Sequence, residues 1–172
     1  MERRRGIRMA SVCKAEETVV DMFAGIGYFT LPIAKHAKPK EIHAIEKNPV
    51  AAGFLKENMR LNRVSCVEAI EGDNRNAPAS MQGIADRVLM GYLPGTEKFL
   101  PAAFGFLKPS GGIIHFHNTY VESELWDEPA RVIESEAKKA GYALQGIGHK
   151  AVVKKFAPGV YHAVVDCSFT SS

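Results

Sequence analysis

A chain of 172 residues with 46% hydrophobic and 24% charged residues has the length and composition of one globular domain that buries its own core. No apolar run approaches the roughly 20 residues that a membrane-spanning helix needs, so we expect no membrane protein. The net charge of +3 equals that of the first ten residues alone, so residues 11–172 are neutral overall and do not form a generally basic nucleic-acid-binding core.

The first half of the chain alternates short apolar runs with helical patterns. Strands are predicted over residues 18–22, 41–46 and 66–70. A Gly-rich turn and a helix over 29–37 separate the first two strands. Asn48 followed by Pro49 has the form of a helix N-cap with a first-turn proline, and predicts a helix that runs to about Leu61.

The second half continues this alternation. Strands are predicted over 86–90, 112–117, 142–146 and 161–169, and helices over 96–107 and 122–140. The last two strands are only about fourteen residues apart, a connection that includes 154–159. A crossover helix does not fit there, so the last strand should be antiparallel to its neighbour. The sequence predicts a doubly wound α/β domain of about seven strands, mostly parallel and covered on both faces.

The segment DMFAGIGYFT, residues 21–30, follows the first strand and opens a helix. Gly25 and Gly27 allow a tight turn and let the backbone approach a ligand. Thr30 occupies the place of the third glycine of a dinucleotide-binding fingerprint, which disfavours a nicotinamide cofactor. Taken alone, the turn is explained equally well as a structural feature.

Acidic residues follow the next two strands. Glu46 ends the second strand, where a carboxylate is suited to bind both ribose hydroxyls of an adenosine. Asp73, in Gly72-Asp73-Asn74, follows the third strand and is placed to accept the adenine amino group. Because the carboxyl ends of parallel strands open into one crevice, these residues together predict an adenosine site.

The segments VVDMFAGIGYFTLPIA, IEKNPVAAGFLKENMRLN and EGDNR resemble class I S-adenosylmethionine (SAM)-dependent methyltransferases, and the resemblance covers essentially the whole chain. They are similar to the archaeal-type tRNA methyltransferases that act on the guanine 3′ of the anticodon. They are equally similar to the sister family, the wybutosine-synthesis enzymes that transfer the aminocarboxypropyl arm of SAM. The two families share these segments, so other motifs must separate them.

The segment DRVLMGYLPGTEKFL, residues 86–100, separates the two families. In the guanine methyltransferases the corresponding strand typically runs into Asn-Leu-Pro, which supplies a polar side chain near the target base. This chain has Gly91 and Tyr92, which is similar to the aminocarboxypropyltransferases, as are the segments IIHFHN and KKFAPGVYHAVVD. Leu93 and Pro94 are similar to the Leu-Pro of the methyltransferases, which therefore remain an alternative.

The resemblance implies transfer of the 3-amino-3-carboxypropyl group of SAM to an electron-rich carbon of 4-demethylwyosine in the anticodon loop of tRNA-Phe, with release of methylthioadenosine. A carbon nucleophile of that kind attacks first and loses its proton afterwards. A base at Gly91 is then unnecessary, and we assign no catalytic base. The expected SAM contacts are Arg8, Asp21, Phe23, Ala24, Gly25, Gly27, Glu46, Lys47, Asp73, Asn74 and Gly91. The expected acceptor contacts are Tyr92, Pro94 and His117.

The remaining candidate residues carry weaker signals. His115 and His117 lie on one face of the fifth strand, but no third ligand has metal-site spacing, so we expect structural or substrate-facing histidines and no metal. Cys13, Cys66 and Cys167 form no CxxC pair, and the start MERRRGIRMA lacks a secretory signal. Both observations favour a reducing cytoplasm.

Contacts with tRNA are expected to be local. They should involve the Arg-rich start and Lys150, Lys154 and Lys155, although these clusters are also explained as solvated surface. Family members usually carry an additional N-terminal region, and we interpret residues 1–172 as the catalytic domain only. Two alternatives remain open: a tRNA guanine-N1 methyltransferase, and a catalytically idle SAM- or nucleotide-binding module that acts as a partner subunit.

Overall fold

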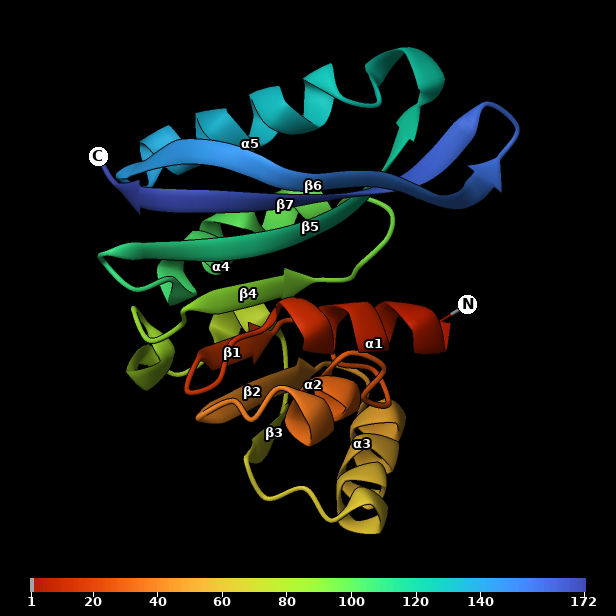
Figure 1. Ribbon diagram of the computed structural model, residues 1–172, viewed down its shortest axis with the longest axis vertical. Coiled ribbons are helices and arrows are strands. Elements are labelled where there is room, and N and C mark those ends of the chain that lie inside the picture. The colour runs from red at the N-terminus through yellow and green to blue at the C-terminus, as the bar shows by residue number, and fades with distance from the viewer. Residues whose placement is uncertain (1) are drawn as a thin grey trace.

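The structure, a computed structural model, describes residues 2–172, and side chains from residue 6 onward. The described residues contain one seven-stranded sheet with the strand order β3-β2-β1-β4-β5-β7-β6 (Figure 1). The strands are β1 (Thr18–Asp21), β2 (Glu41–Glu46), β3 (Val67–Glu71), β4 (Arg87–Met90), β5 (Gly111–Val121), β6 (Tyr142–Ala157) and β7 (Val160–Ser171). Strands β1 to β5 pair in parallel, whereas β7 is antiparallel to both β5 and β6. The predicted mostly parallel sheet with an antiparallel last strand is confirmed.

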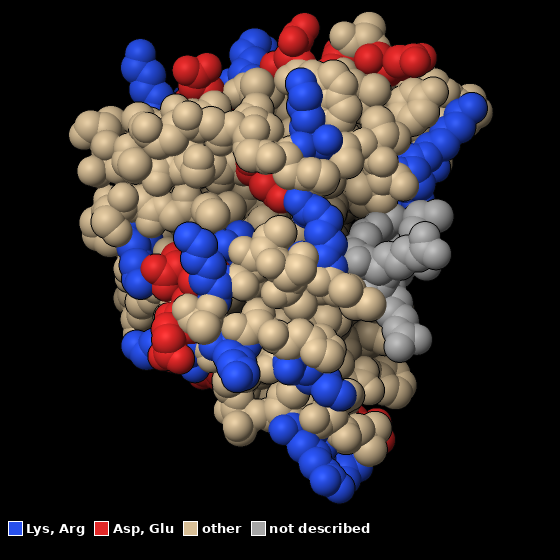
Figure 2. All heavy atoms as spheres, in the orientation of Figure 1, with Lys and Arg blue, Asp and Glu red and all other residues tan. Residues whose placement is uncertain are grey.

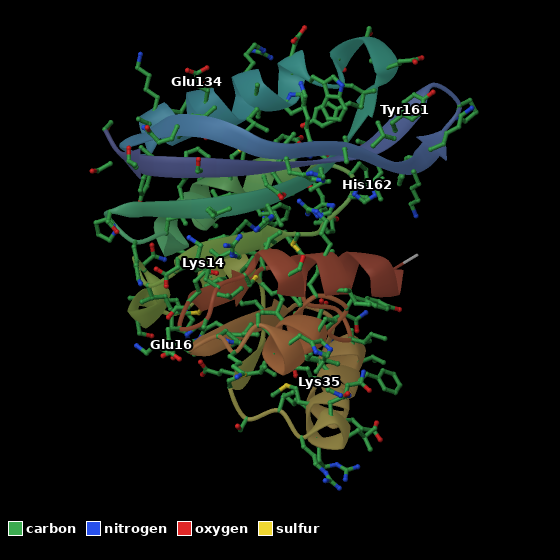
Figure 3. All side chains as sticks on the ribbon, in the orientation of Figure 1. Lys14, Glu16, Lys35, Glu134, Tyr161 and His162 are labelled. Carbon is green, nitrogen blue, oxygen red and sulfur yellow. The ribbon has the colours of Figure 1, made fainter. Side chains whose placement is uncertain are left out.

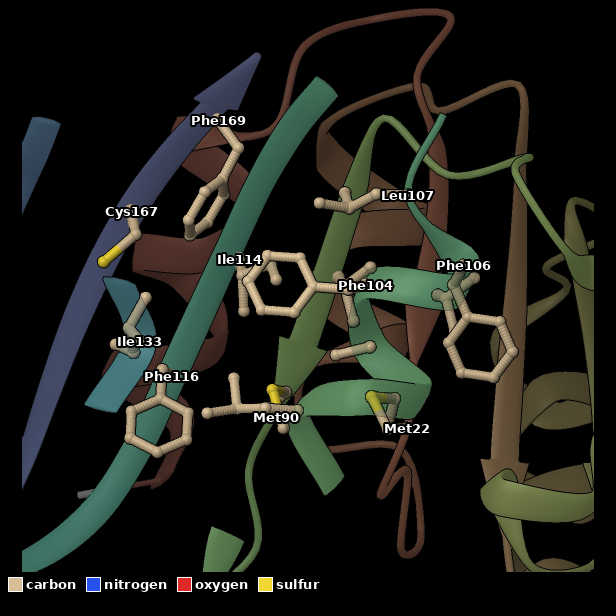
Figure 4. Packing of buried hydrophobic residues seen from close by; sticks show 14 of the residues in the cluster. Met22, Met90, Phe104, Phe106, Leu107, Ile114, Phe116, Ile133, Cys167 and Phe169 are labelled. Atoms are coloured by element: carbon tan, nitrogen blue, oxygen red, sulfur yellow. The ribbon is translucent and has the colours of Figure 1, made fainter. Parts of the chain in front are cut away.

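Helices cover both faces of this sheet. Helices α1 (Glu2–Val12), α2 (Thr30–His36) and α3 (Pro49–Asn62) lie on one face, and α4 (Leu100–Phe106) and α5 (Asp127–Lys139) on the other. Because alternate residues of a strand point to opposite faces, Val19 packs with α1 and α2 while Val20 joins the cluster under α4 and α5. Figure 4 shows that second cluster, in which Met90 and Phe116 of neighbouring strands pack near Phe104 of α4.

Local signals explain where the helices begin. The Asn48 side chain accepts hydrogen bonds from the backbone N–H groups of Val50 (2.9 Å) and Ala51 (3.4 Å), so the predicted N-cap of α3 is confirmed. The helix predicted over 96–107 is divided into a 3-10 turn, Thr96–Phe99, and α4. Pro101 lies in the first turn of α4, the place where a missing N–H costs least.

The prediction for the C-terminal strands was wrong in its boundaries. Strand β6 runs to Ala157 and β7 begins at Val160, so only Pro158 and Gly159 join them instead of a long connection. Lys154 and Lys155, expected in that connection, lie within β6. Strand β6 shows four register shifts against β7, which remove the strict alternation by which a strand is recognised in sequence.

The N-terminal helix α1 was not predicted, because its sequence ERRRGIRMASV is mostly polar and contains a glycine. Met9 of this helix is 2% exposed and packs with Val19, Ile33 and Leu89, whereas Ile7 is 53% exposed. A Cβ at Gly6 would lie 2.5 Å from the backbone oxygen of Tyr28, so only glycine allows α1 to approach α2 this closely. In the described part of the chain, no helix is long and apolar enough to cross a membrane.

Candidate functional site

A cavity of about 380 Å³ opens at the carboxyl ends of β1 to β4, the edge where the sequence predicts an adenosine site. Its lining residues are Met22, Phe23, Glu46, Lys47, Gly72, Asp73, Asn74, Arg75, Gly91, Tyr92 and Phe99. Six of the predicted SAM contacts and one predicted acceptor contact therefore come together here, from four separate strand ends. What each of them binds stays a prediction.

Glu46 joins the Gly-rich turn to the start of α3. One carboxylate oxygen, Oε2, accepts a hydrogen bond from the backbone N–H of Gly25 at 2.7 Å, and Oε1 accepts one from the N–H of Asn48 at 2.8 Å. Each oxygen keeps one acceptor position, which is what a pair of ribose hydroxyls requires. Gly25 has a φ of +55°, so the turn that carries this N–H favours glycine.

Four further predicted contacts, Asp21, Ala24, Gly25 and Gly27, belong to the Gly-rich turn or lie beneath it and do not line this cavity. Asp21 is fully buried, where Oδ2 accepts a hydrogen bond from Thr30 Oγ1 at 2.8 Å. Burial raises the pKa of Asp21 to about 6. The Ala24 N–H donates to the Ile45 carbonyl at 2.9 Å, and a Cβ at Gly27 would lie 2.8 Å from Leu31 Cγ. These residues shape the turn from below.

Asp73 and Asn74 differ in whether their side-chain oxygens already accept hydrogen bonds within the protein. Asp73 contacts Lys47 Nζ at 3.1 Å and Arg75 Nη2 at 2.7 Å, and hydrogen bonds from Arg75 hold the pKa of this carboxyl well below its usual range. Asn74 is 5% exposed and donates from Nδ2 to the Met22 carbonyl at 2.9 Å, which fixes the orientation of the amide. Among the described residues, Asn74 Oδ1 has no hydrogen-bond partner. The better acceptor for a bound base is therefore Asn74.

Aromatic rings form one wall of the cavity. Tyr92 stacks on Phe23 with ring centroids 5.0 Å apart and meets Phe99 edge to face at 5.5 Å. Tyr92 therefore packs at the rim, and 43% of it is exposed. At Gly91 a Cβ would lie 3.0 Å from the ring of Phe29, so this position has little room for a side chain. Pro94 lies outside this cavity and lines an adjacent hollow.

A polar network occupies the sheet face beneath α1. Arg87, 2% exposed, donates two hydrogen bonds to Glu17 at 2.8 and 3.0 Å, and its Nη1 lies 2.6 Å from Nε2 of His115. His115 Nδ1 lies 2.7 Å from Asp166 Oδ1, and Asp166 Oδ2 pairs with Arg8 of α1. Although burial opposes ionisation of Asp166, His115 and Arg8 hold its pKa at about 2. The network ties α1 to β4, β5 and β7.

Arg8 was expected to contact SAM; in the structure it lines a second cavity of about 430 Å³ together with Arg87, His115 and Asp166. It is not among the residues that line the first cavity. Sequence reasoning missed Glu17, Arg87 and Asp166. A usable signal was present, because Arg87 and Asp166 are charged residues inside otherwise apolar strands.

His117, a predicted acceptor contact, is buried within β5 and does not line the first cavity. Its Nδ1 lies 2.9 Å from Nε2 of His162 on β7, and its ring lies 5.7 Å from that of Phe29. Within residues 2–172, no three histidine, cysteine or carboxylate side chains are arranged to hold a metal ion.

Comparison with known proteins identifies the family. The family model described as the TRM5/TYW2 methyltransferase domain matches residues 1–145. The chain belongs to the TRM5/TYW2 methyltransferase-domain family. This confirms the resemblance seen in the sequence. A curated relative in Methanocaldococcus jannaschii, named tRNA(Phe) (4-demethylwyosine(37)-C(7)) aminocarboxypropyltransferase, is 48% identical over 162 residues, which is 94% of this chain. The chain spans 64% of that relative's length.

Solved structures of TRM5/TYW2 proteins have the same fold. The crystal structure of M. jannaschii TYW2 in complex with AdoMet matches with a TM-score of 0.94 and 46% identity, covering 98% of this chain and 75% of that one. The crystal structure of wild-type Trm5b from Pyrococcus abyssi matches with a TM-score of 0.88 and 29% identity, covering 97% of this chain and 48% of that one. The domain thus has the SAM-dependent methyltransferase fold, and of these two structures the TYW2 protein is more similar in sequence.

Proposed function

We propose that this domain binds SAM and transfers its 3-amino-3-carboxypropyl group to a carbon of the 4-demethylwyosine precursor beside the anticodon of tRNA-Phe. The observation that carries the proposal is the Gly91 turn at the edge of the adenosine-sized cavity. A methyltransferase of this family would present a polar side chain there, whereas Gly91 presents none. The by-product of the proposed transfer is methylthioadenosine.

The residues around the cavity suit the nucleoside part of SAM. Glu46 keeps one acceptor position on each oxygen for the two ribose hydroxyls. The unpartnered Oδ1 of Asn74 suits the adenine amino group, because a buried acceptor without a donor is costly. Lys47 and Arg75, which pair with Asp73, are exposed at the rim of this cavity.

Positioning is the chemistry that the domain contributes. The sulfonium activates the methyl carbon and the γ-carbon alike, so the protein must align the γ-carbon with the nucleophile and turn the methyl away. Well-oriented groups lower a barrier by up to about 7–11 kcal/mol. Gly91 presents no side chain to the cavity that it lines, and Tyr92 and Phe23 form the wall beside it.

The deciding experiment identifies the sulfur product after incubation of the chain with SAM and precursor tRNA. Methylthioadenosine with an aminocarboxypropyl group on the tRNA supports the proposal. S-Adenosylhomocysteine with a methylated guanine would instead establish the alternative, a tRNA guanine methyltransferase. SAM binding without either product would point to an idle binding module. Three free cysteines favour a reducing compartment such as the cytoplasm.

Ribose binding gives a first prediction. Glu46→Ala removes the acceptor for both hydroxyls and also releases the N–H groups of Gly25 and Asn48 that fix the turn. Hydrogen bonds to a charged group contribute about 1.5–3 kcal/mol each, so calorimetry should show SAM affinity reduced at least roughly tenfold. Glu71→Ala, at the exposed end of β3, is the matched control and should bind SAM normally. Unchanged affinity in Glu46→Ala would move the ribose site elsewhere.

The distal part of the β6–β7 hairpin is the surface we assign to tRNA. Lys150, Lys154 and Lys155 are exposed along β6, and Figure 2 shows Lys or Arg atoms along the distal end of this hairpin. Phe156, 47% exposed, lies among them. Cationic side chains with an exposed ring suit the phosphates and unstacked bases of an anticodon loop. The Arg-rich start, also expected to contact tRNA, lies largely outside the described side chains.

Salt dependence tests this surface. In Lys154→Ala/Lys155→Ala, tRNA affinity should fall. The logarithm of the association constant should also depend less steeply on the logarithm of the salt concentration, with the negative slope becoming shallower by about one unit for each lysine removed. Lys138→Ala/Lys139→Ala, in the last turn of α5 just before β6 begins, serves as the charge-matched control and should leave the slope unchanged. Equal slopes for all three proteins would exclude the hairpin as the tRNA contact.

A further inference from the structure

Asn118 of β5 is hydrogen-bonded at two points to the segment that follows Gly91. Its Oδ1 accepts a hydrogen bond from the backbone N–H of Gly95 at 3.3 Å, and its Nδ2 donates one to Oε2 of Glu97 at 2.7 Å. Oδ1 also accepts the N–H of Thr119 at 2.9 Å, which fixes the orientation of the amide. Asn118 is 6% exposed, so its side chain is held within the fold.

These hydrogen bonds connect the sheet to an exposed turn. Along this part of β5, Asn118 pairs with Ala163 of β7 and Thr119 pairs with His162, which Figure 3 labels on β7. Residues 91–95, in contrast, belong to no helix or strand, and none of them is buried. Segments with few buried contacts open most readily. The turn therefore depends on side-chain hydrogen bonds for its position.

The 3-10 turn Thr96–Phe99 links these hydrogen bonds to the first cavity. Its last residue, Phe99, lines the cavity and lies edge to face with Phe23, with ring centroids 4.9 Å apart. Its second residue, Glu97, is the one that Asn118 binds. A hydrogen bond from β5 thus holds the short segment that carries part of the cavity wall.

We propose that Asn118 is a positioning residue for the transfer: by holding Gly95 and Glu97, it fixes the turn in which Gly91 and Tyr92 border the bound SAM. This inference rests on the proposed aminocarboxypropyl transfer. Asn118 lines the adjacent hollow and not the first cavity, so it acts through the turn and not on SAM itself. The methyl carbon and the γ-carbon are bonded to the same sulfur. A small displacement of the wall beside it therefore changes which of them is aligned with the nucleophile.

The main test exchanges the donor and the acceptor of the pair that Asn118 forms with Glu97. Asn118→Asp keeps an acceptor for the Gly95 N–H, but it places a second carboxylate against Glu97, and like charges at this distance repel. With saturating SAM and precursor tRNA, the single-turnover rate of methylthioadenosine formation should fall on the order of tenfold or more. SAM affinity, measured by calorimetry, should be retained.

A compensating variant separates positioning from general damage. In Asn118→Asp/Glu97→Gln the glutamine amide becomes the donor and the aspartate the acceptor, so most of the lost rate should return. Glu97→Gln alone keeps an oxygen that accepts from Nδ2 of Asn118 and should lose little rate. Asn62→Asp, at the end of α3, is the charge-matched control. Its Oδ1 accepts from Lys35, and this variant should react like the wild type.

Hydrogen exchange measured by NMR tests the contact without turnover. In Asn118→Ala the Gly95 N–H loses its acceptor and should exchange faster than in the wild type, whereas the N–H of Ile114 within β5 should keep its protection. Because Asn118→Ala adds no charge, it also replaces Asn118→Asp if that variant does not fold. It should show the same loss of rate with SAM affinity retained, and a larger share of S-adenosylhomocysteine among the products.

Three results would overturn the role of Asn118. They are a wild-type rate in folded Asn118→Asp, a double variant as slow as the single one, and unchanged Gly95 exchange in Asn118→Ala. Loss of SAM affinity in parallel with the rate would also overturn it, because a positioning residue acts after SAM has bound. A wild-type chain that forms no methylthioadenosine would refute the proposed function instead, so the two failures are distinguishable.

Discussion

Replacing Gly91 by asparagine should reduce methylthioadenosine formation by on the order of a hundredfold while SAM still binds. A Cβ at this position would already lie 3.0 Å from the Phe29 ring, so the larger asparagine amide has to displace that ring or turn into the cavity that we propose holds the aminocarboxypropyl arm. A misplacement of about 1 Å at a reacting centre costs rates of this size. SAM binding should persist because Glu46 and Asn74, the residues that we propose contact the nucleoside, lie at other strand ends. Calorimetry and product analysis measure the two properties separately.

Gly91→Ala gives a graded control for this prediction. Its single methyl group requires Phe29 to move by a few tenths of an ångström, so its loss of rate should be much smaller than that of Gly91→Asn. A shift of the product toward S-adenosylhomocysteine in Gly91→Asn would show that this turn selects the reacting carbon. A fully active Gly91→Asn protein would contradict the positioning role of Gly91.

The largest effect on stability is expected at Arg87. In Arg87→Met the Glu17 carboxylate, whose side chain is only 12% exposed, loses two charge-assisted hydrogen bonds, and the Val12 carbonyl loses one of 2.9 Å. Removing one partner of a buried ion pair typically costs about 3–5 kcal/mol, because the remaining charge is left uncompensated. Urea unfolding should show the midpoint falling accordingly, with the slope unchanged if unfolding stays two-state.

Two further variants separate the ion pair from general damage to the core. Arg87→Met/Glu17→Gln should recover part of the lost stability, because the second substitution removes the unpaired charge. Arg131→Met breaks an exposed ion pair with Glu128 and should unfold like the wild type. If Arg87→Met were as stable as Arg131→Met, the network beneath α1 would contribute little to the fold.

Much of the fold and of the cavity follows from local patterns in the sequence. Consecutive residues are enough to recognise the apolar runs of β1, β2 and β4, the Asn48-Pro49 start of α3 and the Gly-rich turn. The structure confirms each of them. Ligands bind at the carboxyl ends of parallel strands, and this rule is enough to predict that Glu46, Asn74 and Gly91 line one cavity. Gly91 and Tyr92 also indicated the branch of the family, since they replace a polar side chain.

The tertiary structure alone decided which distant side chains meet. Arg8 and Asp166 are 158 residues apart and His117 and His162 are 45 apart, so no local spacing encodes their contacts. The pairing depends on the register of β5 against β7 and on which face each residue occupies, because a shift by one residue sends a side chain to the other face. Helix α1 was missed for the same reason. Its sequence has weak helix signals, and the helix is stabilised by the packing of Met9 and the ion pair of Arg8 with Asp166. Both contacts need a sheet that forms only when the whole chain folds.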